Sequence, residues 1–167
     1  MEPDLRTVMR HFATGVGVVS VWTPEPSAGG GRRHDAVTVN SLAPVSWDPP
    51  LVSLCLRHDS AFLADLLKAG KWAVSILGAD GAATAGRLAR PREKRSEALA
   101  ELRSAPGEHT GALVFEGAGW LECALTESFT AGDHLMVIGR ALATGVTPSR
   151  RRLVFLNGVM SPAPAAG

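Results

Sequence analysis

Two short polar segments contain residue types that could bind a flat polar ligand. The segment 38–41 reads Thr-Val-Asn-Ser, which places hydroxyl and amide groups on an extended stretch that leads to the pair Pro49-Pro50. Because proline fixes φ, the pair makes the start of the next strand rigid, and such an edge could hold a planar ring by its backbone. His134 follows the turn formers at 132–133 and begins an apolar run. A neutral imidazole there can hydrogen-bond an amide or hydroxyl group.

A third polar segment, 57–60, follows the next apolar run and is suited to a phosphate. Arg57 offers a planar fork of donors, and Ser60 lies where a helix would begin, a position that favours anions. Each segment also has a purely structural interpretation. Residues 38–41 could decorate the exposed face of a strand, residues 59–60 could cap a helix, and residues 132–134 could form an ordinary hairpin turn. The residue types alone leave these alternatives open.

Size and composition predict one domain, spanning residues 1–167, with a substantial apolar core. The net charge of +1 gives no general argument for binding nucleic acid or a membrane surface, and no apolar stretch is long enough to cross a bilayer. Cys55 and Cys123 lie in apolar stretches and are expected to be reduced, buried thiols of a cytoplasmic protein. The five histidines lack the spacing of metal ligands, so we expect no metal site.

The pattern of elements favours a β protein. Runs of β-branched and apolar residues predict strands at 16–22, 36–43, 51–56, 72–77, 120–127, 134–144 and 153–159. Apolar spacing and caps predict helices that begin at 5 and end at Gly15, that run over 60–68, and that run over 80–102 with a break near Pro91. Residues 24–31 and 104–111 are predicted to be loops. Many strands joined by turns favour a closed or partly closed antiparallel barrel over a doubly wound sheet.

The segments 38–50 and 132–134, in this order, resemble the flavin reductase family of the FMN-binding split-barrel fold, over nearly the whole chain. The resemblance implies a mainly β fold, an antiparallel split β-barrel of Greek-key type with a few peripheral helices, assembled as a homodimer. It also implies an NAD(P)H:flavin oxidoreductase, with FMN or FAD as flavin and NADH or NADPH as hydride donor. Reduced flavin would then diffuse to a separate flavin-dependent monooxygenase.

The resemblance also implies roles for individual residues. The segment comprising Thr38, Val39, Asn40 and Ser41 would contact the flavin ring by its backbone and the ribityl phosphate by its hydroxyls. Ser46 and Pro50 belong to the family's proline corner at the pocket wall. Arg57, Ser60 and Lys94 would meet the phosphate or ribityl chain. His134 would lie beside the nicotinamide, and Asp133 would orient its turn.

Three departures from the family pattern keep other functions open. The chain contains no tyrosine, and residues 156–160 replace an aromatic segment that commonly lines the nicotinamide side. Asp35 stands where glycine is usual, and Lys94-Arg95 is not followed by phenylalanine. One alternative is therefore a flavin-dependent enzyme acting directly on a small organic substrate. The other is a non-catalytic flavin-binding protein on the same fold.

Overall fold

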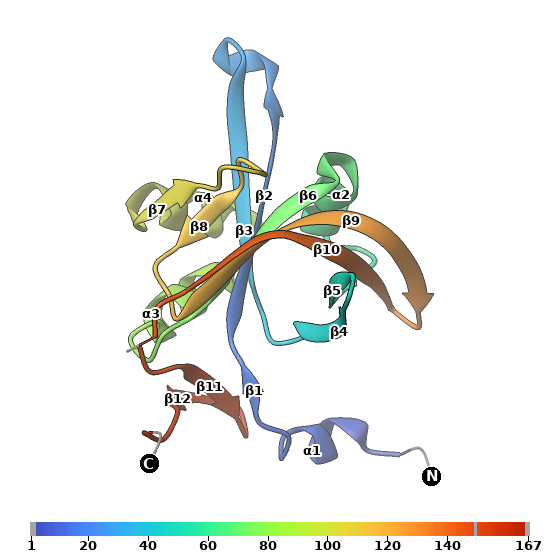
Figure 1. The fold of residues 1–167 in the computed structure, drawn as a ribbon, viewed down its shortest axis with the longest axis vertical. Coiled ribbons are helices and arrows are strands. Elements are labelled where there is room, and N and C mark those ends of the chain that lie inside the picture. Colours follow the sequence, from blue (N-terminus) through green and yellow to red (C-terminus); the bar gives the residue numbers. More distant parts are fainter. Residues whose placement is uncertain (1–2, 149, 166–167) are drawn as a thin grey trace.

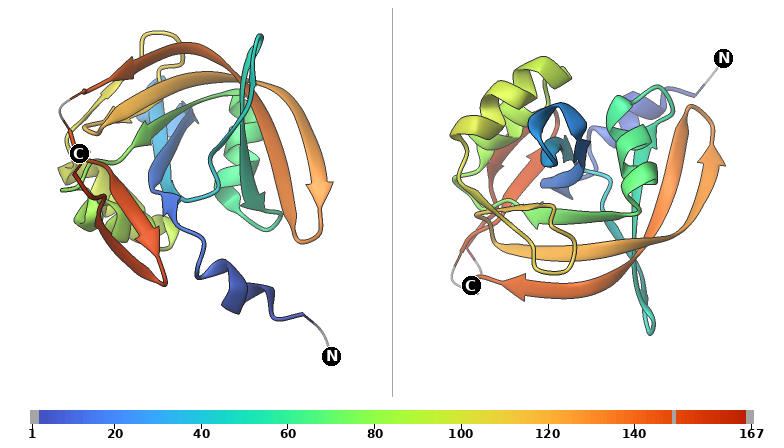
Figure 2. Two further views of the ribbon diagram at one scale, coloured as in Figure 1. Left: turned by 60° about the horizontal axis from the view of Figure 1, so that its bottom comes forward. Right: turned by 90° about the horizontal axis from the view of Figure 1, so that it is seen from above.

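A strongly bent antiparallel sheet forms the body of the protein in the computed structural model, which describes residues 3–148 and 150–165. Its strands are β2 (Gly17–Glu25), β3 (Gly31–Val39), β4 (Ala43–Trp47), β5 (Pro50–Arg57), β6 (Lys71–Ile76), β9 (Gly119–Ala131) and β10 (His134–Val146). They are ordered β3-β2-β6-β9-β10-β5-β4, so β3 and β4 are the two edges. Figure 2 shows the strong curvature of the sheet's two long strands, β9 and β10, in orange. The predicted mainly β, antiparallel split-barrel fold is confirmed; the ends of the predicted domain, 1–2 and 166–167, lie outside the described residues.

Short strands form two smaller sheets beside this body. One contains β1 (Thr14–Gly15), β11 (Leu153–Leu156) and β12 (Val159–Pro162), and the other contains β7 (Ser104–Pro106) and β8 (Leu113–Phe115). The loop predicted at 104–111 therefore includes a strand. The strand predicted at 153–159 is divided, because Asn157 and Gly158 both have positive φ (52° and 79°) and form a tight hairpin turn.

The β2–β3 hairpin is longer than predicted and projects from the body (Figure 1). The sequence predicts a loop at 24–31, yet β2 continues through Glu25 and Pro24 lies opposite Arg32. Pairing of β2 with β6 covers only Gly17 to Ser20. Beyond that point β2 has one neighbour, so a proline without an N–H is tolerated there. A short 3₁₀ turn, η1 (Pro26–Ala28), joins the two strands.

The described residues form four α-helices: α1 (Leu5–Met9), α2 (Ala61–Ala69), α3 (Ala82–Leu88) and α4 (Arg92–Glu101). The last three pack on the sheet, whereas α1 extends away from it (Figure 1). Ser60 caps α2 by accepting a hydrogen bond from the Leu63 amide, and Gly70 ends it in the left-handed region. The break between α3 and α4 at Pro91 is as predicted. α1 is shorter than predicted and buries none of its side chains. Within the described residues, no helix has the length and apolarity needed to cross a membrane.

The core lies in two apolar clusters. One fills the inside of the barrel beneath α2 and includes Leu54, Phe62, Leu66, Trp72 and Val137. The other lies between β2, α3, α4 and β11 and includes Val18, Leu77, Leu88, Phe115 and Leu153. A side chain at Gly139 would meet the Trp72 ring at 2.2 Å, so the close approach of that ring requires glycine.

A buried carboxylate anchors α4 to the sheet. Asp35, only 4% exposed, accepts hydrogen bonds from Arg95 at 2.9 and 2.7 Å and from Arg92 at 3.0 Å. Arg92 also pairs with Asp65 of α2, which pairs in turn with Arg33 of β3. The aspartate that departs from the family pattern is therefore the centre of an ion-pair network. Basic residues are dense between 87 and 95 in the sequence and could otherwise suggest a phosphate site, but this network engages two of them, Arg92 and Arg95.

Candidate functional site

A cleft of about 330 Å³ opens where the edge strand β3, the end of β5 and the start of β10 meet. Antiparallel pairing places His134, the first residue of β10, directly opposite Arg57, the last residue of β5. The cleft brings together seven of the predicted site residues: Thr38, Val39, Asn40, Ser41, Arg57, Ser60 and His134. Two smaller cavities, of about 200 and 130 Å³, share Val39 and Asn40 with it, so the hollow continues past the end of β3.

Three predicted residues lie elsewhere. Ser46 and Pro50 belong to the tip of the β4–β5 hairpin, beside Trp47, which is 86% exposed. Pro50 and Arg57 are the two ends of β5, seven residue steps apart in an extended strand, a distance of about 23 Å. Lys94 lies exposed on α4 and pairs with Glu97 at 3.3 Å. The proline corner therefore does not form the wall of this cleft, and Lys94 is directed to solvent.

The hydroxyls along the β3 edge are engaged within the chain. Thr38 donates to the Ala85 carbonyl of α3 at 2.6 Å. Ser41 donates to the Cys55 carbonyl and accepts from the Cys55 amide, both at 3.1 Å. Ser60 accepts from the Leu63 amide at 3.3 Å, so the structure assigns it the helix-cap role and leaves its own O–H able to donate. Since β3 ends the strand order, its outer backbone groups form an open edge beside the cleft.

Two titratable side chains that line the cleft, Arg57 and His134, are paired with neighbouring carboxylates. Arg57 donates to both carboxylate oxygens of Asp59, at 3.0 and 2.9 Å, and its guanidinium lies 3.9 Å from Asp133. Asp133 in turn lies 2.7 Å from His134 Nδ1. Hydrogen bonds from Arg57 and His134 lower the pKa of Asp59 and of Asp133, respectively, so both carboxylates are ionised.

Because Asp133 holds Nδ1, Nε2 is the His134 nitrogen that remains available to a ligand. The turn before it is fixed by Gly132, with φ of 61°, and by a hydrogen bond from the His58 amide to the Asp133 carbonyl at 3.2 Å. The Asp133 backbone is thus held within the turn, and its carboxylate contacts the His134 imidazole directly.

Sequence reasoning missed part of the cleft lining, namely Val37, Cys55 and Leu56. Cys55 is half-buried rather than buried, in contrast to the prediction. The signal was present in the spacing, because residues 55 and 57 of one strand point to the same face. Cys123 is buried as predicted, and burial raises the pKa of its thiol to about 12. A thiol with such a pKa is unreactive at neutral pH.

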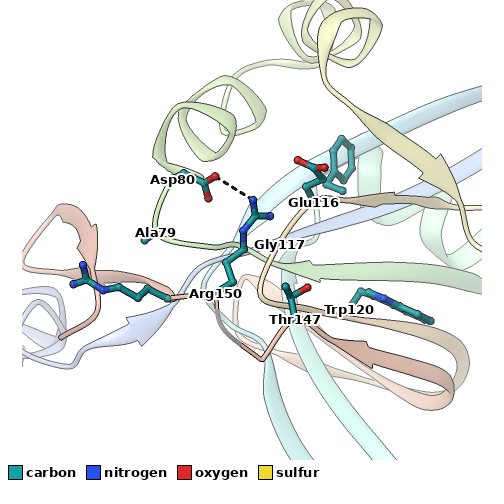
Figure 3. A pocket seen from close by; sticks show the side chains of 9 residues that line it. Ala79, Asp80, Glu116, Gly117, Trp120, Thr147 and Arg150 are labelled. Atoms are coloured by element: carbon teal, nitrogen blue, oxygen red, sulfur yellow. Dashed lines mark hydrogen bonds and ion pairs between the residues drawn. The ribbon is translucent and has the colours of Figure 1, made fainter. Parts of the chain in front are cut away.

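A larger cavity, of about 700 Å³, lies at the opposite end of the β9–β10 pair (Figure 3). Its lining includes Trp120, Thr147 and Glu116. Two further lining residues form an ion pair, in which Arg150 donates to Asp80 at 3.3 Å. Arg151 instead donates to the Ala163 carbonyl. Two of the three consecutive arginines at 150–152 are thus held within the chain, and none of the predicted site residues lines this cavity.

The smaller cleft fits a flavin by the chemistry of its donor set. Its volume lies within the range of small-molecule sites, about 300–1,000 Å³. An open strand edge offers backbone donors and acceptors to a planar polar ring. The start of α2 at Ser60 offers donors to a phosphate, and Arg57 would contribute its guanidinium by exchanging Asp59 for the phosphate. In the described part of the chain, no group of three or more His, Cys, Asp or Glu side chains is placed to hold a metal ion.

Comparison with known proteins agrees with this chemistry. The flavin reductase like domain family model matches residues 9–164. The flavin reductase (NADH) of Kitasatospora aureofaciens is 33% identical over 144 residues, which cover 85% of this chain and 71% of that protein. The NADH-dependent FAD reductase of Streptomyces globisporus is 32% identical over 157 residues, covering 93% and 82%. A probable flavin reductase of Rhizobium meliloti is 34% identical over 139 residues, but this chain spans only 42% of its length.

Solved structures give the same result. The flavin reductase component BorF of a bacterial two-component tryptophan halogenase superposes with a TM-score of 0.85 at 36% identity, covering 97% of this chain and 98% of that one. The Streptomyces globisporus NADH:FAD oxidoreductase in complex with NAD and FAD fragments superposes with a TM-score of 0.86 at 30% identity, covering 98% and 93%. The family expected from segments 38–50 and 132–134 is confirmed, and the chain belongs to the flavin reductase family.

Proposed function

We propose that this protein is a flavin reductase that uses NADH or NADPH to reduce FMN or FAD and releases the product to a separate monooxygenase. The observation that carries the proposal is the cleft that gathers Arg57, Ser60, His134 and the end of β3. The protein is proposed to act as one domain in the cytoplasm, where its thiols, unpaired at Cys55 and Cys123, would remain reduced.

Catalysis in this cleft is a matter of position rather than of acids or nucleophiles. When bound, the flavin supplies the hydride acceptor. The protein has to hold two rings with reacting atoms about 3–3.5 Å apart. The open edge of β3 binds one ring by its backbone, while Arg57 and Ser60 hold the phosphate. His134, with Nδ1 fixed by Asp133, presents Nε2 to the carboxamide or ribose of the nicotinamide.

A cavity beside the cleft is lined by an aromatic residue despite the altered C-terminal segment. Phe155 and Met160 line the cavity of about 200 Å³ that adjoins the cleft at Val39 and Asn40. They reach this position because β11 and β12 form the hairpin that carries them. We therefore propose that Phe155 takes the place of the missing aromatic segment, and that this side admits a nicotinamide.

The exposed face of α1 supports a homodimer. Leu5, Val8, Met9 and Phe12 form an apolar stripe, and Phe12 is 62% exposed. A helix of five residues is not stable in water without tertiary contacts. Leu156 and Val159 are also exposed at this end of the molecule, where the Asn157 amide donates to the Arg10 carbonyl at 2.9 Å. A second copy is the proposed cover of this surface.

Phe12→Asp should convert the dimer to a monomer, because it places a charge in the apolar stripe. Light scattering coupled to size-exclusion chromatography would measure the mass, with Phe12→Leu as the matched control that retains the dimer. A wild-type protein that is monomeric at micromolar concentration, or a dimeric Phe12→Asp variant, would contradict the proposed interface.

Asp133→Asn should raise the KM for NADH by about 2- to 10-fold, because the imidazole loses a charged partner. The hydrogen bond with His134 lowers the pKa of Asp133, so the carboxylate is ionised at any pH above its ordinary pKa of 3.8. Its pairing with the imidazole is lost only as the pH falls through the lower pKa of the folded protein. Asp133 is therefore ionised throughout the neutral range, and the increase in KM should be present there. Steady-state kinetics at about pH 7.5 would test this, and an unchanged KM for NADH in the variant would argue against it.

The function itself is tested by adding NADH, with free FMN or FAD, to the purified protein. Loss of NADH absorbance that depends on both protein and flavin is the expected result. Bound flavin without NADH turnover would favour an enzyme that acts directly on a small organic substrate. Neither colour nor turnover would favour a binding role.

A further inference from the structure

The Ser41 hydroxyl links two segments that both line the cleft, namely the end of β3 and the end of β5. The pairing of β4 with β5 ends at Ala43, which lies opposite Ser53. Two residues beyond, both backbone polar groups of Cys55 are instead bonded to the Ser41 Oγ at 3.1 Å. One hydroxyl that donates and accepts therefore replaces the pair of bonds that a neighbouring strand would supply.

This contact lies between segments that line opposite sides of the site. Residues 38–41 form one wall, and Cys55 with Leu56 belongs to the other. On the far side of β3, Thr38 is bonded to the Ala85 carbonyl at 2.6 Å. The end of β3 is thus held from both sides, and removal of either bond would free the edge to move.

We infer that Ser41 is a positioning residue that sets the place of the flavin-binding edge and is not a ligand of the flavin phosphate. The inference rests on the proposed function, and it revises the phosphate role that the family resemblance implies for this hydroxyl. Its single O–H donor is used by the Cys55 carbonyl, so none is left for a phosphate oxygen. Phosphate recognition then belongs to Arg57 and Ser60, and the effect of Ser41 is on the ring, which all flavins share.

Comparing FMN with riboflavin, which lacks the phosphate, separates the two roles. Dissociation constants would be measured by quenching of flavin fluorescence for wild type, Ser41→Ala, Ser41→Thr and Ser27→Ala. Ser41→Ala should weaken both flavins by the same factor, about 5- to 10-fold. Ser41→Thr, which keeps a hydroxyl, should restore most of the affinity. Ser27→Ala, at the exposed β2–β3 turn, should change neither constant.

Two outcomes of the binding measurements on Ser41→Ala would overturn the inference. One is FMN binding weakened at least about threefold more than riboflavin binding, and the other is no weakening of either. Amide hydrogen exchange of the wild type gives a readout that does not depend on a folded variant. The Cys55 amide should be protected, and exchange at the rate of an unfolded chain would overturn the inference as well. Wild-type protein that binds no flavin would overturn the proposed function, whereas flavin binding with no response at position 41 would overturn this inference alone.

Discussion

His134→Ala should slow the reduction of flavin by NADH about 10- to 100-fold and leave the flavin dissociation constant within about twofold of wild type. The imidazole lies at the mouth of the cleft, across from Arg57, and it is fixed by the 2.7 Å contact with Asp133. Without it, the nicotinamide loses the partner that aligns it over the flavin. Anaerobic stopped-flow measurement of hydride transfer, over a range of NADH concentrations, would give the rate directly.

His109→Ala is the matched control, because that exposed histidine lies outside the cleft. It should leave both the rate and the flavin affinity unchanged. If His134→Ala transfers hydride at the wild-type rate at every NADH concentration, His134 has no part in the reaction. If it instead loses flavin binding, its role is to hold the flavin rather than the nicotinamide.

Asp35→Ala should lower the free energy of unfolding by about 3–5 kcal/mol, because it leaves the buried Arg95 without its carboxylate partner and Arg92 with Asp65 alone. Removing one member of a buried ion pair strands a charge in a low dielectric environment. Urea denaturation followed by tryptophan fluorescence would measure the loss.

Lys94→Ala is the control for Asp35→Ala, since it removes an exposed ion pair on the same helix. It should change the free energy of unfolding by less than about 1 kcal/mol. A loss of similar size in the two variants would show that the buried network contributes no more than a surface pair.

Features governed by local sequence could be predicted from the chain. Ser60 and Gly70 delimit α2 because a cap and a left-handed stop depend on neighbouring backbone groups. Pro91 separates α3 from α4. The hairpin at 132–133 forms where predicted, because a glycine at positive φ is part of the turn itself.

Features governed by distant contacts could not be predicted in this way. β7 is a strand only because β8 pairs with it, and residues 104–106 are too few to show a period. The apolar stripe of α1 has the spacing of a buried helix face, but within the chain it remains exposed. The spacing identifies a face that needs a partner and does not say which molecule provides it.

The candidate site also combines features that the sequence predicts with features that depend on distant contacts. The order of motifs predicted residues 38–41, Arg57, Ser60 and His134, which the fold brings to one cleft. It could not show that Ser46 and Pro50 lie at the other end of β5, because that follows from the β4–β5 register. Nor could it show that Asp35 of β3 is paired with two arginines of α4.

A crystal structure of the protein with FMN would test the central claim most directly. The isoalloxazine ring should lie against the backbone of residues 38–41, with His134 facing it and the phosphate near Arg57 and Ser60. A ring bound instead in the larger cavity lined by Trp120 and Thr147, at the far end of β9 and β10, would contradict the account.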